Sequence, residues 1–234
     1  MEYGQYCPVA KAAEVLGEKW TLLILRELLY GTARFNEFQR AISGISPTML
    51  NKRLKELEAN GLVTKQGHEY SLTPAGEDLG PLIRQYAIWG MRWTRGELSE
   101  TELDIELLMW DIRRRIRPEY LPESGCLIQV HLSDQSENAD WWLSVADGEV
   151  ALSSKPPKAE PDLVIRSQLR ALIALWMGDI PLRTALAHRQ LTLLGQPMLI
   201  RAIEQWLPLA RYANVRPVST PRTELQGKRR RVRR

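Results

Sequence analysis

The segment from residue 46 to residue 60 constrains the fold more than any other part of the chain. Ser46 is a favoured helix N-cap, because its hydroxyl accepts a hydrogen bond from an otherwise unpaired backbone amide. Pro47 suits the first helical position, where its missing N–H leaves no bond unmade. An apolar stripe follows at helical spacing and consists of Leu50, Leu54 and Leu57. Since Asn60-Gly61 favours termination, the sequence predicts a helix with one buried face over residues 46–60.

The elements around this helix predict a winged helix-turn-helix domain. A helix over residues 34–42 precedes it, and residues 43–45 leave room only for a tight turn, which is the spacing of a helix-turn-helix. Two short strands, residues 62–65 and 69–72, follow and form a wing around Gln66-Gly67-His68. Pro81 should kink the last helix or displace its start. The remaining helices of this half are expected over residues 8–16, 19–30 and 73–93.

The face of the predicted helix opposite the leucines mixes hydrogen-bonding groups with positive charge. Its members are Thr48, Asn51, Lys52 and Lys55. Asparagine pairs with adenine in the major groove, and lysine reaches guanine or phosphate. We therefore expect base contacts from Thr48, Asn51 and Lys52 and a backbone contact from Lys55.

Phosphate contacts are expected around this face. Arg53 borders it and should meet the DNA backbone. Ser46 and Pro47 lie at the helix N-terminus, where free amides attract anions. Lys65 and His68 of the wing should reach an adjacent phosphate or the minor groove. The alternative is a solvated helix face in a domain that binds other proteins.

The second half of the chain predicts an α+β domain with a mostly antiparallel sheet. Asp147-Gly148 is a strong hairpin turn. Strands are expected over residues 126–132, 141–145, 149–153, 163–165 and 190–194, and helices over residues 102–115, 168–177, 181–187 and 197–206. The predicted organisation is a DNA-binding and dimerisation domain at residues 1–96, a ligand-binding domain at residues 102–209 and a disordered tail at residues 216–234.

Charge is distributed unevenly along the chain. The whole carries a net charge of +4, but residues 97–215 hold 12 basic and 17 acidic residues, whereas residues 216–234 hold 8 basic residues and 1 acidic residue. Such asymmetry suggests nucleic-acid contact at one part and another task in the middle. The basic tail is expected either to add non-specific phosphate contacts or to serve solubility.

Several classes of protein are not supported by the sequence. None of the 3 histidines, His68, His131 and His188, lies near a second histidine or a cysteine at metal-ligand spacing, and no phosphate loop or nucleophile motif occurs. Neither a secretory signal nor an apolar run of membrane-spanning length is present, and the 2 cysteines make no disulfide framework. We therefore expect a cytoplasmic protein that is not an enzyme and has no cofactor, metal or membrane partner.

Several motifs in the first half resemble the HxlR family of bacterial transcription regulators, which are relatives of the MarR type. They are Cys7-Pro8-Val9, Gly17-Glu18-Lys19-Trp20-Thr21-Leu22-Leu23-Ile24-Leu25-Arg26, Arg34-Phe35-Asn36-Glu37-Phe38, Gly44-Ile45-Ser46-Pro47-Thr48-Met49-Leu50, Arg53-Leu54-Lys55-Glu56-Leu57-Glu58, Gly61-Leu62-Val63 and Tyr70-Ser71-Leu72-Thr73-Pro74-Ala75-Gly76. The resemblance implies a homodimer on a roughly two-fold operator, with dimer contacts from the first helix and the helix after the wing. The wing here is shorter than is common in the family.

The second half resembles a sterol-carrier-protein type-two domain, which surrounds an apolar tunnel with helices and a sheet. The motifs are Pro161-Asp162-Leu163-Val164-Ile165, Leu169-Arg170-Ala171-Leu172-Ile173-Ala174-Leu175, Gly178-Asp179-Ile180-Pro181-Leu182-Arg183-Thr184-Ala185-Leu186 and Leu191-Thr192-Leu193-Leu194-Gly195-Gln196-Pro197. The resemblance implies an apolar or lipid-like ligand. The expected lining is Trp142, Leu169, Leu172, Trp176, Met177, Leu186 and Met198, with Leu175 and Ile203 beside them. The alternative is that these residues close a solid core.

Two hypotheses of function remain open at this point. The first is a DNA-binding regulator, more simply a repressor, that responds to an apolar ligand. The second is a lipid carrier whose winged helix only dimerises. Cys7 adds a further choice, because its place before Pro8 at a helix N-terminus favours the thiolate. Some family members sense quinones or oxidants at the matching cysteine, whereas the alternative is a small side chain packed at the dimer contact.

Overall fold

The computed structural model of the protein describes residues 2–96 and 98–218, and its chain divides into two compact units between Ile88 and Trp89. Of the tail expected over residues 216–234, residues 219–234 and all the basic residues from Lys228 onward lie outside the described residues. No helix in the described part of the chain is long and apolar enough to cross a membrane.

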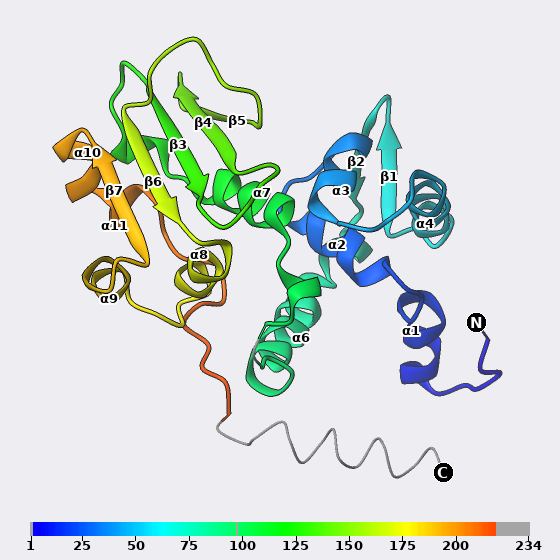
Figure 1. Ribbon diagram of the computed structural model, residues 1–234. Coiled ribbons are helices and arrows are strands. Elements are labelled where there is room, and N and C mark those ends of the chain that lie inside the picture. The colour runs from blue at the N-terminus through cyan, green and yellow to red at the C-terminus, as the bar shows by residue number, and fades with distance from the viewer. Residues whose placement is uncertain (1, 97, 219–234) are drawn as a thin grey trace. The chain divides into compact units, whose positions relative to one another are not determined.

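The N-terminal unit is the predicted winged helix-turn-helix domain (Figure 1). Its first four helices are α1 (Pro8–Leu16), α2 (Thr21–Leu29), α3 (Phe35–Ala41) and α4 (Pro47–Ala59). The start of α4 is as predicted, because Ser46 Oγ accepts a hydrogen bond from the Met49 amide at 3.2 Å and Pro47 occupies the first turn. The leucine stripe of α4 is completely or almost completely buried, and it packs with Ile24, Leu25 and Phe38 in one core.

The wing consists of β1 (Val63–Gln66) and β2 (Glu69–Leu72), which pair antiparallel. Gln66 lies opposite Glu69, so the turn has only two residues, Gly67 and His68. Gly67 has φ +60°, a conformation that glycine adopts without steric cost and that suits the first position of such a turn.

The helix expected over residues 73–93 is divided into α5 (Pro74–Glu77) and α6 (Gly80–Trp93). Thr73 caps α5 by accepting a hydrogen bond from the Gly76 amide at 3.2 Å. Pro81 lies at the second residue of α6, where it has no preceding turn to disrupt. The prediction that Pro81 displaces the start of the helix is therefore confirmed.

The C-terminal unit contains a five-stranded sheet in the order β5-β4-β3-β6-β7. Its strands are β3 (Cys126–Leu132), β4 (Asp140–Ala146), β5 (Glu149–Ser153), β6 (Leu163–Ser167) and β7 (Leu191–Gly195). Only the central pair β3 and β6 is parallel, so the predicted mostly antiparallel sheet is confirmed. Asp147 and Gly148 join β4 to β5 with φ +51° and +75°, as a hairpin turn of the predicted kind requires.

The helical elements of this unit are η1 (Glu100–Glu102), α7 (Ile105–Arg115), η2 (Pro118–Tyr120), α8 (Leu169–Trp176), α9 (Leu182–Ala187), α10 (Pro197–Arg201) and α11 (Ile203–Trp206). The single helix expected over residues 197–206 is wrong, because Ala202 (φ −92°, ψ 6°) separates α10 from α11. Leu199 and Trp206 are both buried across this bend, and the Trp206 indole N–H donates to the Leu199 carbonyl at 2.9 Å.

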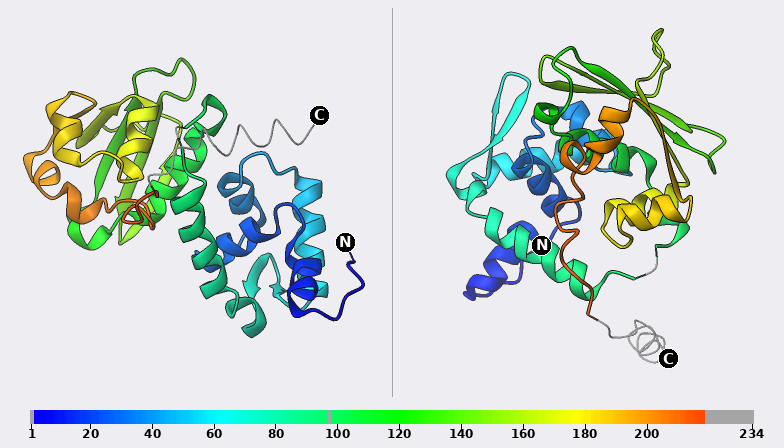
Figure 2. Two further views of the ribbon diagram at one scale, coloured as in Figure 1. Left: turned by 90° about the horizontal axis from the view of Figure 1, so that it is seen from below. Right: turned by 90° about the vertical axis from the view of Figure 1, so that its left-hand side faces the viewer.

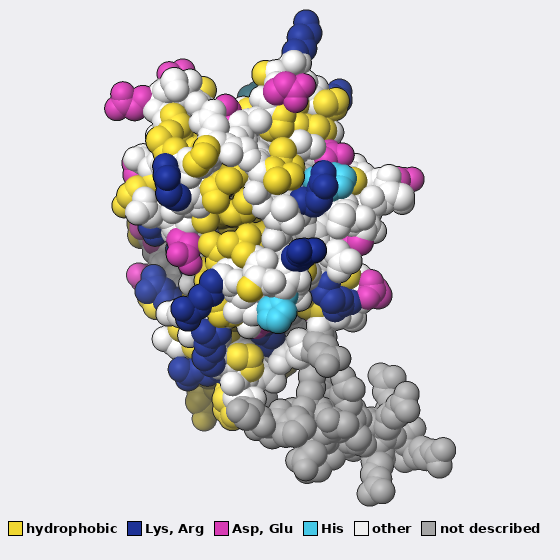
Figure 3. All heavy atoms as spheres, turned by 60° about the vertical axis from the view of Figure 1, so that its left-hand side comes forward, with side chains coloured by type: hydrophobic (Ala, Val, Ile, Leu, Met, Phe, Trp, Pro, Cys, Tyr) yellow, Lys and Arg dark blue, Asp and Glu magenta, His cyan; other side chains and the backbone are white. Residues whose placement is uncertain are grey.

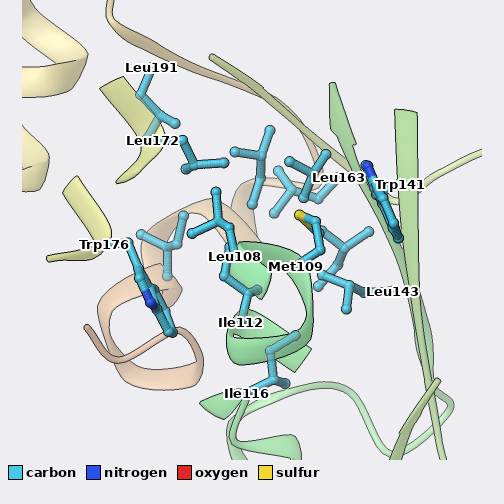
Figure 4. Packing of buried hydrophobic residues seen from close by; sticks show 14 of the residues in the cluster. Leu108, Met109, Ile112, Ile116, Trp141, Leu143, Leu163, Leu172, Trp176 and Leu191 are labelled. Carbon is cyan, nitrogen blue, oxygen red and sulfur yellow. The ribbon is translucent and has the colours of Figure 1, made fainter. Parts of the chain in front are cut away.

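Helices α7 and α11 pack on one face of the sheet (Figures 1 and 2). Strand β3 turns Ile128, Val130 and Leu132 toward these helices and leaves Gln129 and His131 on the other face. Figure 4 shows the α7 side chains between those of the sheet and Trp176 of α8. The core therefore lies between one face of the sheet and its helices, and the pocket described below lies at the α8 side of this core.

Candidate nucleic-acid interface and apolar pocket

Helix α4 presents a polar face to solvent. Ser46, Pro47, Thr48, Asn51, Lys52 and Lys55 are all exposed, as the leucine stripe on the opposite side predicts. The Lys52 ammonium lies 3.9 Å from the Glu56 carboxylate, one helical turn away. Lys55 has no ion-pair partner within the described ranges, so its charge is available to a bound anion. All of these residues except Pro47 offer a hydrogen-bonding side chain or a positive charge on this face.

The wing carries the two exposed residues Lys65 and His68. The Lys65 ammonium lies 5.2 Å from the centre of the Tyr70 ring, a cation–π distance that orients the side chain. Arg34 and Glu69 form an ion pair of 3.0 Å beside the turn of the wing, and the Tyr70 amide donates to the Ala33 carbonyl at 2.8 Å. This attachment of the wing to the segment before α3 was not predicted from the sequence.

The position of Arg53 corrects the expectation that it meets backbone phosphate. Its side chain is only 8% exposed, and it bonds within the domain to Glu18, Lys19 and Glu56. The physical reason is its place in the helix, three residues after Leu50 and four before Leu57, which puts it at the edge of the buried stripe. Its guanidinium is therefore committed to intramolecular partners.

An apolar pocket of about 420 Å³ opens beside α8 in the C-terminal unit. Its lining combines α7, β6, α8, α9, β7 and α11 with the chain segments on either side of them: Ile112, Ile165, Leu172, Leu175, Trp176, Gly178, Ile180, Pro181, Leu182, Leu191, Ile203, Glu204, Leu207, Leu209 and Arg216. Glu204 and Arg216 are the charged residues among them. Figure 3 shows the side of this unit that carries α8 to α11, where hydrophobic side chains form a band with lysine and arginine residues beside it.

The predicted lining is only partly right. Leu172 and Trp176 line the pocket, as do Leu175 and Ile203. Leu169 is buried in the core instead, and Met177 ends α8 half-buried against that core. The remaining three predicted residues, Trp142, Leu186 and Met198, are also absent from the lining.

The reasons for these differences lie in strand alternation and helix facing. Trp142 stands between the inward Trp141 and Leu143 on β4, so its side chain takes the opposite face of the sheet. Leu186 and Met198 are 38% and 53% exposed, because each lies on the outer side of its short helix. The spacing of apolar residues alone does not predict on which face of the sheet, or on which side of a helix, a side chain lies.

The segment that follows α11, residues 207–216, forms one side of the pocket and is called here the C-terminal strap. Leu207, Leu209 and Arg216 of the strap line the pocket. The Ala210 amide donates to the Trp176 carbonyl at 2.9 Å, and Arg216 Nη1 donates to the Gly178 carbonyl at 2.8 Å. Sequence reasoning missed the strap, although two leucines after Trp206 were a signal that the chain continues along the domain.

The two cysteines differ in environment. Cys7 is half-exposed at the N-cap of α1, and the Lys11 ammonium one turn along pairs with Glu14 at 2.9 Å rather than with the thiol. Cys126 is buried on β3, and this burial, together with the nearby Asp162 carboxylate, raises the pKa of its thiol to about 11.

Comparison with known protein families gives two matches along the chain. HxlR-like helix-turn-helix domains match residues 15–97, and the SCP-2 sterol transfer family matches residues 114–208. The first match spans α2 to α6, and the second spans the five-stranded sheet and α8 to α11 of the C-terminal unit.

Relatives of the first half have names that refer to transcription. The chain is 37% identical over 101 residues to the HTH-type transcriptional regulator YvaP of Bacillus subtilis. These aligned residues cover 40% of this chain and 94% of YvaP. It is also 37% identical over 106 residues to the HTH-type transcriptional regulator YkvN of the same organism, and the aligned residues cover 42% of this chain and 90% of YkvN. Among solved structures, one described as a MarR-family regulator from Porphyromonas gingivalis is 40% identical over 37% of this chain and 92% of that chain, with a TM-score of 0.34.

The exposed face of α4, the wing and the matches with regulators over nearly their whole length agree with one another. The chain therefore belongs to the HxlR-like helix-turn-helix family of transcriptional regulators, and it joins that DNA-binding domain to a domain of the SCP-2 sterol transfer family.

Proposed function

We propose that this regulator is a repressor that binds a two-fold operator as a homodimer in the cytoplasm and is controlled by an amphipathic ligand in its C-terminal unit. The observation that carries the DNA-binding part is the polar face of α4, which remains exposed while the opposite face forms the core. A dimer that occupies promoter DNA blocks transcription without any further activity, which favours repression.

Base and phosphate contacts divide along α4. Asn51 and Thr48 offer hydrogen bonds to base edges, and Lys52 offers a donor to guanine. Lys55 and the free amides at Ser46 favour phosphate, which positions the helix without reading sequence. Lys65 and His68 extend the phosphate contacts through the wing. Arg53 has no place in this set, because its guanidinium is buried.

An apolar stripe along α6 supports the dimer. Leu82, Tyr86, Trp89 and Trp93 recur at steps of four, three and four residues and are between 49% and 63% exposed. This spacing is that of a helix which packs on another helix. None of the nine residues of α1 is buried, so α1 also has surface available for a partner. Two-fold symmetry would then place half-sites about one DNA turn apart.

The pocket favours a ligand with an apolar body and an anionic head. Its volume of about 420 Å³ lies within the range of pockets for small organic ligands. Arg216 lines it and has no carboxylate within ion-pair distance in the described part of the chain, so a ligand carboxylate would satisfy it. Glu204 also lines the pocket and would disfavour a second negative charge. A fatty acid fits this description better than a neutral sterol.

Control by such a ligand requires a difference in affinity between the DNA-bound and the free dimer. The experiment is a pair of titrations on the purified full chain. Operator duplexes selected from a random library should bind with an affinity that falls steeply with salt, by a slope of about 0.9 per phosphate contacted. A fluorescent fatty acid should bind saturably and change the operator affinity.

The second candidate function is a lipid carrier whose winged helix only dimerises. Saturable fatty-acid binding without any selected duplex would favour the carrier. Sequence-selective DNA binding that a bound fatty acid leaves unchanged would remove ligand control and keep the regulator.

A further inference from the structure

The connection between α1 and α2, residues 17–20, meets the middle of α4 at Arg53. Arg53 Nε donates to the Lys19 carbonyl at 3.1 Å, and Arg53 Nη2 lies 2.8 Å from Glu18 Oε2. Arg53 Nη1 pairs with Glu56 on its own helix. A single buried side chain thus joins two segments that are about 35 residues apart in the sequence.

The Arg53 guanidinium has acceptors on each of its three nitrogens. A buried guanidinium is tolerated only when carboxylates and acceptors replace the water that it has lost. Glu18 and Glu56 supply two carboxylates and Lys19 supplies a carbonyl oxygen. Arg53 also lowers the pKa of the Glu18 carboxyl, so Glu18 remains charged below the pH at which a free glutamate takes up a proton.

The backbone of the connection is strained next to the Arg53 contact. Trp20 has φ +81°, the left-handed region that side chains other than glycine rarely adopt. Such a conformation persists where the surrounding structure holds it in place. The Lys19 carbonyl bonded to Arg53 belongs to the peptide group immediately before Trp20, and the Lys19 ammonium lies 4.4 Å from the centre of the Trp20 ring.

We propose that Arg53 is a positioning residue that fixes α4 to the connection 17–20 and so sets the orientation in which Asn51 and Lys52 reach DNA. The inference rests on the proposed DNA contact of α4. It differs from a phosphate contact in one respect: Arg53 acts through Glu18 and Lys19 and never touches the nucleic acid.

The two roles predict opposite effects of a change at Glu18. If Arg53 bound phosphate, Glu18→Gln would release the guanidinium and add a positive charge, and DNA would bind more tightly. If Arg53 positions α4, the same substitution weakens the attachment and DNA binds less tightly despite the added charge. Glu18 is partly exposed, with 36% of its side-chain surface accessible, and Arg53 keeps its ion pair with Glu56 in this variant, so the substitution does not leave the guanidinium without a carboxylate.

The experiment compares the full chain with Glu18→Gln, Arg53→Gln and the double variant, using duplexes selected from a random library by the unmodified protein. We expect Glu18→Gln to lower operator affinity by at least about fivefold with an unchanged salt slope. The double variant should bind the operator no more weakly than Arg53→Gln, because each of the two substitutions removes the same interaction between Glu18 and Arg53. Lys55→Gln is the matched control, and its salt slope should fall by about 0.9.

Equal or tighter DNA binding by Glu18→Gln overturns the proposal, and so does a reduced salt slope in Arg53→Gln. Should Arg53→Gln not fold, the Glu18→Gln titration still decides. Should the unmodified protein select no duplex, the proposed function fails by itself. The interaction between Glu18 and Arg53 is then measured by thermal unfolding of the unmodified protein, the two single variants and the double variant. Additive effects of the two substitutions on stability would contradict the proposal that Arg53 attaches α4 to residues 17–20.

Discussion

Gly178 and Ala213 lie in direct contact where the C-terminal strap passes the end of α8. A Cβ atom built on Gly178 would lie 2.8 Å from the Ala213 carbonyl oxygen and 3.0 Å from its Cβ, and Gly178 has φ +76°. Position 178 therefore requires glycine both for its backbone conformation and for the closeness of the strap. Since Gly178 and the strap both line the pocket, their contact sets the shape of the pocket wall.

Gly178→Ala should displace the strap and disturb the pocket. We expect a loss of roughly 3 kcal/mol in the free energy of unfolding and weaker binding of a fluorescent fatty acid. Gly148→Ala is a matched control, because Gly148 has nearly the same φ, +75°, but open space around its Cβ position. It should cost only about 1 kcal/mol of backbone strain and leave the titration unchanged. Equal effects of the two substitutions on ligand binding would contradict a role of the strap in the pocket.

Substitutions at Asn51 and Lys55 should have different effects, because Asn51 is proposed to contact a base and Lys55 a phosphate. Asn51→Ala should narrow the difference in affinity between the selected operator and its point variants, because the bidentate contact to adenine is lost. Lys55→Ala should weaken binding to every duplex by a similar factor and reduce the salt slope by about 0.9. Anisotropy titrations at several salt concentrations measure both quantities. Loss of sequence preference in Lys55→Ala, with preference intact in Asn51→Ala, would reverse this assignment.

The thiols should react at very different rates in the folded protein. Because the pKa of Cys126 is raised to about 11 by burial and by Asp162, its thiol stays protonated at pH 8, and the thiolate is the species that reacts. Iodoacetamide at pH 8 should therefore modify Cys7 and spare Cys126 until denaturant is added, as counted by mass spectrometry. Modification of both thiols in the native protein would contradict the burial.

Whether Cys7 is a sensor is a separate question. If it is, diamide should change operator binding of the unmodified protein and leave that of Cys7→Ser unaffected. An identical response of the two proteins would leave Cys7 as a side chain packed at a helix end.

Local signals predicted the elements of this fold well. The Ser46 cap, the glycine-containing turn at 147–148 and the strand over residues 126–132 each depend on neighbouring residues only, and the structure has all three. The break at Ala202 was missed because nothing in residues 197–206 disfavours one continuous helix. It arises from tertiary packing, which buries Leu199 and Trp206 together.

The sites were less predictable because their geometry is set by segments distant in the sequence. Arg53 lies at the edge of the leucine stripe, and it is buried because Glu18 and Lys19, from a distant segment, pack against it. Leu209 and Arg216 became pocket residues because the strap returns past α8. Neither relationship leaves a periodic signal in the sequence.

The stripe on α6 should be the part of the dimer contact most sensitive to a charge. Trp89 is 55% exposed, so Trp89→Glu leaves the core of the monomer intact while it places a carboxylate where a second helix would pack. Aromatic side chains at the centre of an interface contribute most to its affinity, and we expect the dimer to dissociate at a concentration at least about 30-fold higher. Sedimentation velocity across a dilution series measures this change.

Arg84→Glu is the control for the added negative charge, since Arg84 is exposed on α6 two positions after Leu82 and therefore on the side away from the stripe. It should leave the dimer intact. Dissociation should also reduce DNA binding, because a monomer contacts one half-site and about half as many phosphates, so the salt slope of Trp89→Glu should be about half that of the unmodified protein. A Trp89→Glu protein that stays dimeric at nanomolar concentration would show that the two copies meet elsewhere, and α1, none of whose residues is buried, would be the next surface to test.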